Sequence, residues 1–355
     1  MNILTKYIVV EILKAALVAI LVLLTLYNLF TFADEMGDLD KGEYGLKQIV
    51  LYLLLTTPGA LNELMPSAAL LASMLVLGTM TNSHELVAMR IATFSFLSII
   101  KAVLLAGIIL VLFSMSISEF IVPIAERTAQ VMKAKAQKKE VLLQTNYGFW
   151  LRDENTYINV RQMPGDGQLA DISLYELDEQ GVVRTIKHAQ RAIYIEPNRW
   201  LLEGVVQTLI GDNKITAAKI DKLDWETAMD PGFLDVVVVR SATLSLHDLF
   251  KYIQFLKGNG QKSESFELAF WNRLADPLVL MMMLLVAVPI VLKANIQMSV
   301  GIRILLGTIF GIGFHLFDKI IGHIGLVYGF DPMLMGVLPS MAITIAAVSV
   351  IARMR

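Results

Sequence analysis

The run AALVAILVLLTLYNLFTFA at residues 15–33 holds 19 consecutive uncharged residues, most of them aliphatic or aromatic. A helix needs about 20 such residues to cross the hydrocarbon core of a bilayer. The apolar region of a cleaved signal is shorter, usually about 7–15 residues, and here Glu11 and Lys14 would interrupt it. The run is therefore predicted to be a retained first membrane span, with residues 7–14 as an amphipathic lead-in.

Five further segments have the same character. The stretch at 48–83 has Glu63 as its only formal charge and is interrupted by Pro58 and Pro66. It is too long for one upright span, so it predicts an interfacial helix followed by a kinked second span. The remaining predicted spans are 98–122, which would end at Pro123, 274–292, 304–321 and 332–352.

The composition agrees with a membrane protein. Hydrophobic residues make up 55% of the 355 residues and charged residues 17%, against about 25% charged in an average soluble chain. The net charge of −2 offers no basic face for nucleic acid, and the absence of cysteine excludes disulfides, thiolate catalysis and thiolate metal sites.

The orientation is predicted from basic residues in short loops and near span ends, which favour the cytoplasm. One side would hold Lys6, Lys14, Arg90, Lys101, Lys293, Arg303, Arg353 and Arg355. Short loops on the other side hold Lys41, Lys47 and Lys319. Both termini are therefore predicted to be cytoplasmic, and the central polar region outside.

That central region has the pattern of a β domain. Short bursts of aromatic and β-branched residues, such as 157–160, 172–177 and 205–210, are separated by turn residues such as those at 164–167. Closely spaced short strands favour an antiparallel sandwich or jelly roll. The predicted fold is thus a polytopic α-helical membrane protein with six transmembrane helices (3+3) and an inserted β domain. Its parts are residues 1–136, the β domain at 137–242, and residues 243–355, which begin with an amphipathic helix capped by Ser245.

No catalytic motif is found. The chain has no phosphate-binding loop and no nucleophile elbow, and the zinc-protease-like His84-Glu85 lacks its second histidine because position 88 is Ala88. Neither catalytic residues nor a metal site is predicted. Four ionisable residues in or beside the spans are candidates for function: Glu63, Glu119, Asp276 and Asp318. Each alone has a structural explanation: Glu119 would reach the membrane interface, Asp276 would cap a helix start before Pro277, and Asp318 would form a solvated pair with Lys319. As a group, they would suit a polar cavity. A membrane-embedded lipid-modifying enzyme stays open as an alternative, and it requires Glu63, Glu119 and Asp276 to converge.

The loop between the second and third spans, residues 82–92, is predicted to form a short cytoplasmic helix. Asn82 is a suitable N-cap and Glu85 stands three residues later, as in a capping box. Helical spacing places Glu85, Ala88 and Met89 on one face. Small residues around one carboxylate would form a surface that could dock into the groove of a partner protein.

Several short motifs occur in a characteristic order: Pro66 with residues 68–71, residues 85–87 with Met89, Glu119 with Pro123, residues 252–260, and residues 326–329 with 338–340. Together with the 3+3 layout around a β domain, they resemble the lipopolysaccharide export system permeases of the LptF/LptG family over nearly the whole chain. The resemblance implies a permease subunit of an ATP-driven ABC transporter in the inner membrane of a Gram-negative bacterium, without enzymatic activity of its own. The β domain would then be periplasmic. Such a transporter extracts lipopolysaccharide from the outer leaflet and passes it to a periplasmic bridge.

The resemblance also implies partners and site residues. The partners would be a paralogous permease of the LptF type, two copies of an LptB-type ATPase, and a single-span LptC-type jelly-roll subunit. ATP and magnesium would be bound by the ATPase, so no cofactor is expected in this chain. Which of the two paralogous permeases the chain represents stays open. By resemblance, the ATPase-coupling residues are Glu85, Leu86, Ala88, Met89 and Arg90, and the lipid-binding residues are Tyr27, Phe30, Thr31, Phe32 and Lys41.

Two positions depart from the family pattern. The outer end of the first span, where basic residues suited to lipid phosphates are expected, is acidic at Asp34, Glu35, Asp38, Asp40 and Glu43, with Lys41 as its only basic residue. The glycine often found soon after the coupling helix is Thr93 here.

Overall fold

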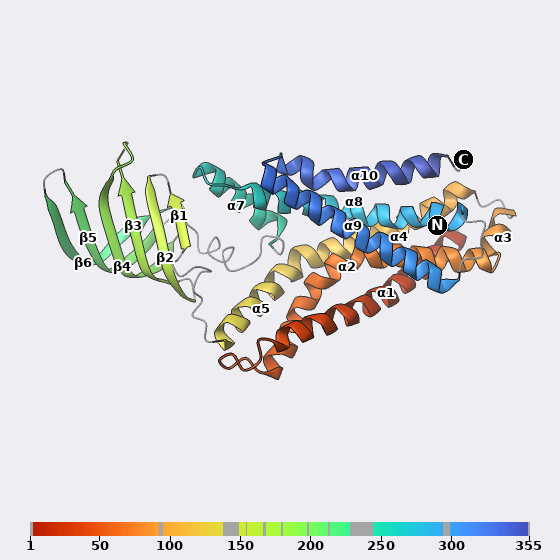
Figure 1. The fold of residues 1–355 in the computed structure, drawn as a ribbon, viewed down its shortest axis with the longest axis horizontal. Coiled ribbons are helices and arrows are strands. Elements are labelled where there is room, and N and C mark those ends of the chain that lie inside the picture. The colour runs from red at the N-terminus through yellow and green to blue at the C-terminus, as the bar shows by residue number, and fades with distance from the viewer. Residues whose placement is uncertain are drawn as a thin grey trace.

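The computed structural model describes residues 3–91, 95–137, 149–153, 155–165, 168–178, 180–196, 199–211, 214–227, 244–293 and 299–353. Long helices form an elongated bundle, and a β sheet lies beyond one end of it (Figure 1). Both termini lie toward the opposite end, where the short helix α3 (Glu85–Ile91) is found. We call these two ends of the bundle the β-domain end and the α3 end.

Among the described residues, six helical segments are long and apolar enough to cross a membrane. Three precede the sheet and three follow it, as predicted. They are α1 (Ile3–Met36), α2 (Leu46–Asn82), the continuous segment Phe96–Ala136, α8 (Glu264–Lys293), α9 (Val300–Tyr328) and α10 (Pro332–Ala352).

The prediction of a separate interfacial helix before the second span is wrong, because α2 is one helix of 37 residues with Pro58 and Pro66 inside it. Thr56 and Thr57, directly before Pro58, donate their hydroxyl groups to carbonyl oxygens of the preceding turn, an adjustment that helps a helix continue through proline. The first half of α2 also packs between α1 and α5. This support keeps it within the bundle.

The helix of the predicted third span does not end at Pro123. The segment runs as α4 (Phe96–Ser116), a π-helical turn η1 (Ile117–Ile121) and α5 (Val122–Ala136). In the π turn, the N–H of Val122 donates to the carbonyl of Ile117, five residues back. The wider turn brings Pro123 into the first turn of α5, where its missing N–H does no harm.

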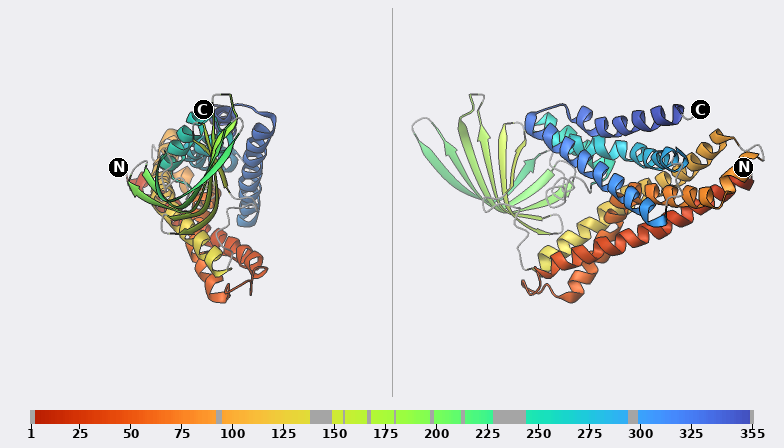
Figure 2. Two further views of the ribbon diagram at one scale, coloured as in Figure 1. Left: turned by 90° about the vertical axis from the view of Figure 1, so that its left-hand side faces the viewer. Right: turned by 45° about the vertical axis from the view of Figure 1, so that its right-hand side comes forward.

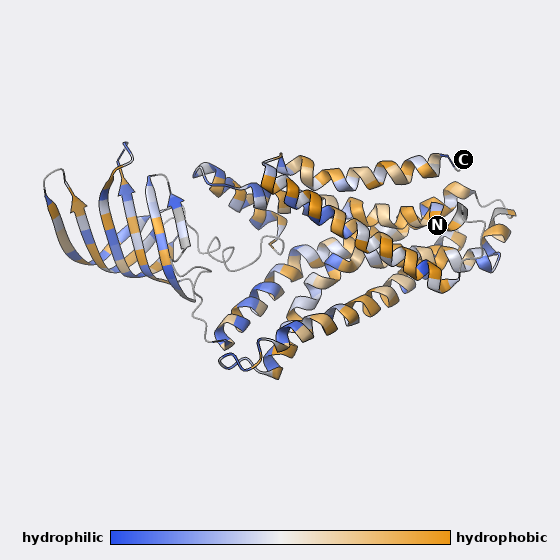
Figure 3. Ribbon diagram, in the orientation of Figure 1, coloured by the Kyte–Doolittle hydropathy of each residue, from blue (hydrophilic) through white to orange (hydrophobic). Residues whose placement is uncertain are grey.

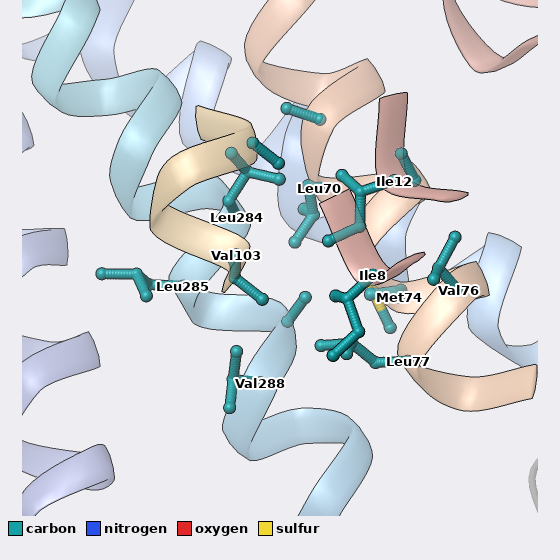
Figure 4. Close-up of a cluster of buried hydrophobic side chains, with 14 of the residues drawn as sticks. Ile8, Ile12, Leu70, Met74, Val76, Leu77, Val103, Leu284, Leu285 and Val288 are labelled. Carbon is teal, nitrogen blue, oxygen red and sulfur yellow. The ribbon is translucent and has the colours of Figure 1, made fainter. Parts of the chain in front are cut away.

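The α3 end of the bundle is closely packed. Figure 4 shows its core, in which aliphatic side chains from α1, α2, α4 and α8 meet without exposed surface; they include Ile8, Ile12, Leu70, Met74, Leu77, Val103 and Leu284. Glycines allow α9 to approach α2, since Gly307 lies against Leu71 and Gly311 against Ser67. Small residues in an i, i+4 pair are a common way for membrane helices to pack. In Figure 3 the helices at this end are mostly hydrophobic, whereas α5 carries many hydrophilic residues.

The described strands form a single six-stranded antiparallel sheet in the order β1-β2-β3-β4-β5-β6, and the sheet is strongly curved (Figure 2). The strands are β1 (Phe149–Asp153), β2 (Thr156–Gly165), β3 (Gln168–Leu177), β4 (Val183–Glu196), β5 (Arg199–Ile210) and β6 (Ile215–Glu226). The antiparallel β domain is confirmed. Within the described strands each pairs with its chain neighbour, and no jelly-roll crossover occurs among them. Fully buried Trp200 lies in the core of the sheet.

Helix α7 (Leu246–Gly258) carries the chain back to the bundle. The hydroxyl oxygen of Ser245 accepts the backbone N–H of Asp248, which confirms the predicted N-cap. Toward the other end of α7, Phe255 packs against the core of the sheet, and Tyr252 lies edge-on to Phe266 of α8, with ring centroids 4.7 Å apart. Burial raises the pKa of the Tyr252 phenol to about 12. The helix therefore contacts both the sheet and the bundle.

Candidate functional site

A cavity of about 690 Å³ lies between the first three and the last three long helices. Its walls come from α1, α2, α4, η1, α5, α7, α8, α9 and α10, and they mix apolar side chains such as Tyr27, Val111, Met283 and Phe314 with ionisable ones. Away from the α3 end, α1, α2 and α5 diverge from α8 and α9 (Figure 1). The same helices that form the dry core at one end thus enclose a mixed polar and apolar space further along.

The four acidic residues singled out in the spans all line this cavity: Glu63, Glu119, Asp276 and Asp318. The structure therefore brings them together, as the prediction of a polar cavity required. Ionisable groups are tolerated at membrane depth when they face such a cavity. Among the residues that the structure describes, no group of three His, Asp or Glu side chains could hold a metal ion.

Glu63 links α2 to α9 across the cavity wall. Its carboxylate oxygen Oε1 lies 3.4 Å from His315 Nε2 and 3.6 Å from Lys319 Nζ. Lys319 had been expected to pair with its neighbour Asp318, but the ion pair that it makes within 4 Å is with Glu63. The side chains of Glu63 and His315 are almost half exposed and that of Lys319 is more than half exposed, so these contacts contribute little to stability.

Glu119 and Arg273 connect three elements at the β-domain side of the cavity. The Glu119 carboxylate accepts the backbone N–H of Leu246 at 3.0 Å, so it holds the start of α7 and does not simply reach the membrane interface. The Arg273 guanidinium donates to the carbonyl oxygens of Leu244 and Ser118, and to the Ser118 hydroxyl at 2.7 Å. Arg273 was not among the predicted site residues. The available signal was an arginine three residues before an in-span aspartate, since the predicted fourth span began directly after it.

Asp276 lies in the interior of α8, so the interpretation of this residue as a helix-start cap before Pro277 is wrong. Its side chain lines the cavity and keeps exposed surface. Arg273 lies three residues before Asp276 on the same helix, and both side chains line the cavity.

The residues predicted to bind lipid fall into two groups. Tyr27 and Thr31 line the cavity. Phe30 is 70% exposed and does not line it, while Phe32 packs against buried Tyr44 and its neighbours at the β-domain end. Of the four aromatic and hydroxyl candidates on α1, the structure therefore places two at the cavity.

The acidic segment that follows α1 is largely tied to α5. Lys133 Nζ lies 2.7 Å from Glu35 and 3.0 Å from Asp38, and Lys41, the fifth lipid-binding candidate, pairs with Asp38 at 2.6 Å. Hydrogen bonds from Lys41 and then Lys133 hold the pKa of the Asp38 carboxyl well below its usual range. Burial, followed by the hydrogen bond to Glu35, raises the pKa of the Tyr44 phenol. Lys133, which was not among the predicted site residues, is thus the centre of this cluster.

The loop helix differs in detail from the prediction. α3 begins at Glu85 itself, and Asn82 is the last residue of α2, so the predicted capping box is wrong. Between the helices, His84 has φ +60°, a sharp reversal that the capping pattern did not anticipate. The Glu85 carboxylate accepts hydrogen bonds from the Tyr7 hydroxyl at 3.1 Å and from the Ser83 hydroxyl at 2.8 Å.

The five predicted coupling residues do not share one surface. Leu86 and Met89 are buried at 3% and 7% exposure within the core of the bundle, so they fix α3 in place. Ala88 is exposed. The exposed apolar side chains are instead Val87 and Ile91, at 51% and 80%. The side chain of Arg90 lies outside the described residues, as do residues 92–94 with Thr93.

Comparison with known proteins places this fold and cavity in context. Residues 6–353 match the sequence model of the family described as lipopolysaccharide export system permease LptF/LptG. The chain is 32% identical over 341 residues to the lipopolysaccharide export system permease protein LptG of Haemophilus influenzae, covering 96% of this chain and 95% of that protein. It is 29% identical over 341 residues to the protein of the same name from Escherichia coli K12, with the same coverage.

Proposed function

Because the chain belongs to the lipopolysaccharide export system permease LptF/LptG family, we propose that it is the LptG-type permease subunit of an ATP-driven transporter that moves lipopolysaccharide out of the inner membrane. Its family and its six apolar helices indicate a multi-pass inner-membrane protein. In the proposed orientation both termini are cytoplasmic, the α3 end faces the cytoplasm and the β domain is periplasmic. The lipid enters from the outer leaflet and leaves toward a periplasmic bridge to the outer membrane.

The observation that carries this proposal is the cavity of about 690 Å³ between the two groups of helices. Apolar walls suit acyl chains, and polar groups on the same walls suit a charged head group. The volume is small for a whole lipopolysaccharide molecule, so one chain would supply part of the site. The rest would come from the paralogous LptF-type permease facing it, and the LptC-type subunit would lie beside the first span.

A photo-crosslinking experiment tests the cavity assignment. Crosslinkers at Tyr27 and Thr31, which line the cavity, are expected to capture lipopolysaccharide in cells. The matched control is Leu29, which lies on the same helix, is 61% exposed and does not line the cavity. Capture of lipid at all three positions alike, or of protein alone at Tyr27 and Thr31, would contradict the assignment.

Energy would reach the permease through α3. The exposed side chains of Val87, Ala88 and Ile91 form an apolar surface next to Glu85 at the tip of the bundle, which suits the groove of an LptB-type ATPase. Leu86 and Met89 support this surface from inside the bundle. ATP and magnesium would be held by two copies of that ATPase.

The coupling proposal is tested by comparing Glu85→Lys with Glu85→Gln in the reconstituted complex. Removing one partner of a desolvated charged pair costs about 2–5 kcal/mol of binding, so Glu85→Lys should weaken ATPase association and uncouple hydrolysis from transport. Glu85→Gln can still accept hydrogen bonds from Tyr7 and Ser83, and it should act more mildly. Normal lipid-stimulated hydrolysis and export with Glu85→Lys would show that Glu85 only holds the loop.

A lipid-modifying enzyme is the competing function, since Glu63, Glu119 and Asp276 do share one cavity. Two of these carboxylates have structural partners, because Glu119 binds the start of α7 and Glu63 faces His315 and Lys319. Turnover of lipid by the purified chain alone would favour the enzyme, and its absence together with crosslinking at Tyr27 would favour transport.

A further inference from the structure

Five residues form a polar joint where the chain returns from the β domain to the bundle. Ser118 and Glu119 belong to η1, Leu246 is the first residue of α7, Leu244 lies two residues before it, and Arg273 belongs to α8. We call these five residues the return joint. They are brought together from positions up to 155 residues apart in the sequence.

The π turn makes this joint possible. In a regular α-helix the carbonyl of Ser118 would accept the N–H of Val122, four residues later. Here Val122 donates to Ile117 instead, and the Ser118 carbonyl accepts from Arg273. The irregular turn therefore exposes a backbone acceptor that a regular helix would hide, and π turns of this kind are frequent at functional sites.

Arginine suits this place because its planar guanidinium carries five donors in a fixed fork. Arg273 uses them on the carbonyls of Leu244 and Ser118 and on the Ser118 hydroxyl. A lysine ammonium is a compact charge that could not match the same fork. Glu119 completes the joint through the Leu246 N–H at 3.0 Å, where a carboxylate at the N-terminus of α7 is also favoured by the helix dipole.

The joint connects the cavity to the sheet. Ser118, Glu119, Leu246 and Arg273 all line the cavity. The helix that they hold, α7, packs Phe255 against the core of the β sheet. The joint and α7 thus form a continuous series of contacts from the cavity wall at η1 and α8 to the sheet.

We propose that the return joint positions α7 and the β domain over the cavity, so that lipid leaving the cavity meets the β domain. Arg273 and Glu119 are positioning residues in this proposal, which rests on the proposed transport function. Without the joint, lipid would still enter the cavity, but its transfer to the β domain would fail.

A distance measurement tests the positioning directly in the full chain. The protein has no cysteine, so two introduced cysteines can be spin-labelled without background. Lys135 on α5 and Lys251 on α7 are both exposed. The distance distribution between labels at these positions should be narrow in the otherwise unchanged protein and broad in Arg273→Met, with Arg273→Lys intermediate.

Transfer is measured in the assembled transporter with crosslinkers at Tyr27 in the cavity and at Leu223, which packs against the core of the sheet. In Arg273→Met, capture at Tyr27 should be unchanged and capture at Leu223 should fall roughly tenfold, the factor expected when hydrogen bonds to one charged group are lost. Glu119→Gln keeps an acceptor for Leu246 and should restore the transfer that Glu119→Ala loses.

A matched pair of serine variants tests the joint independently, in case Arg273→Met does not fold. Ser118→Ala removes a joint contact, whereas Ser116→Ala removes only a bond to its own helix at Leu112. Capture at Leu223 should fall in the first and not in the second. The proposal would be overturned if the two serine variants gave equal capture of lipid at Leu223. It would also be overturned if Arg273→Met lost capture at Tyr27 and Leu223 in parallel, or if the distance between the labels were unchanged in Arg273→Met. Absence of lipid at Tyr27 in the unmodified protein would instead contradict the transport function, and the label distances would still decide the joint.

Discussion

The two ends of the helical bundle are built from the same helices in opposite ways. Toward the α3 end, α2 buries Leu70, Met74 and Leu77 in a hydrophobic core. One to two turns earlier the same helix turns Glu63 and Ser67 to the cavity. The comparison shows that one helix can be an anchor at one end and the wall of a site at the other.

The physical reason lies in what drives helices together in lipid. Lipid tails are as apolar as leucine, so close contact and small residues hold the packed end together. At the cavity, charged residues prevent such contact because each needs water or a polar partner. Division of the bundle into a packed end and an open end therefore follows from where the sequence places its ionisable residues.

The largest change in stability that would test this comparison is expected at Gly311, where α9 contacts α2. A side-chain Cβ here would lie 2.9 Å from the hydroxyl oxygen of Ser67, whereas at Gly313 nothing lies within 4 Å. Gly311→Val should therefore destabilise the protein by about 1–3 kcal/mol through overpacking. Gly313→Val, which makes the same change in helix propensity, should be almost neutral.

Thermal unfolding of both glycine variants in one detergent measures the difference. Equal melting temperatures would mean that α9 does not pack on α2 through its glycines. In that case the boundary between the packed end and the cavity would lie elsewhere.

The sequence predicted the spans well because uncharged runs of sufficient length have few alternatives to crossing a bilayer. The segment α10 has the bounds predicted for the sixth span. The errors concern proline. Pro58 and Pro123 were taken as breaks, but the threonines before Pro58 and the π turn before Pro123 allow the helices to continue. Such compensation depends on neighbouring groups in space, which periodicity does not report.

The sequence identified several residues of the site, but it did not predict which partners they contact. In-span acids identified the cavity, because burying an ionisable group in lipid is costly enough to imply a polar surrounding. Arg273 and Lys133 were missed since their partners are distant in sequence. On α3, helical periodicity could not decide which face packs against the bundle. Leu86 and Met89, which were predicted to contact the ATPase, are buried in the core of the bundle instead.

The smallest loss of stability is expected when the charged contact between Glu63, His315 and Lys319 is removed. The Glu63 carboxylate lies 3.4 Å from His315 and 3.6 Å from Lys319; the Glu63 and His315 side chains are almost half exposed and the Lys319 side chain is more than half exposed. Exposed ion pairs of this kind contribute about 0.2–1 kcal/mol, so Glu63→Gln should lower stability by less than Gly311→Val does. Lys319→Gln should give a similar small loss, and the double variant should show little coupling between the two. Unfolding of the three variants beside Gly311→Val in the same detergent makes the measurement. A loss above about 2 kcal/mol for Glu63→Gln would place this carboxylate in a dry, fully paired environment. The contrast between a packed end and an open, polar one would then fail at the residue where it should be clearest.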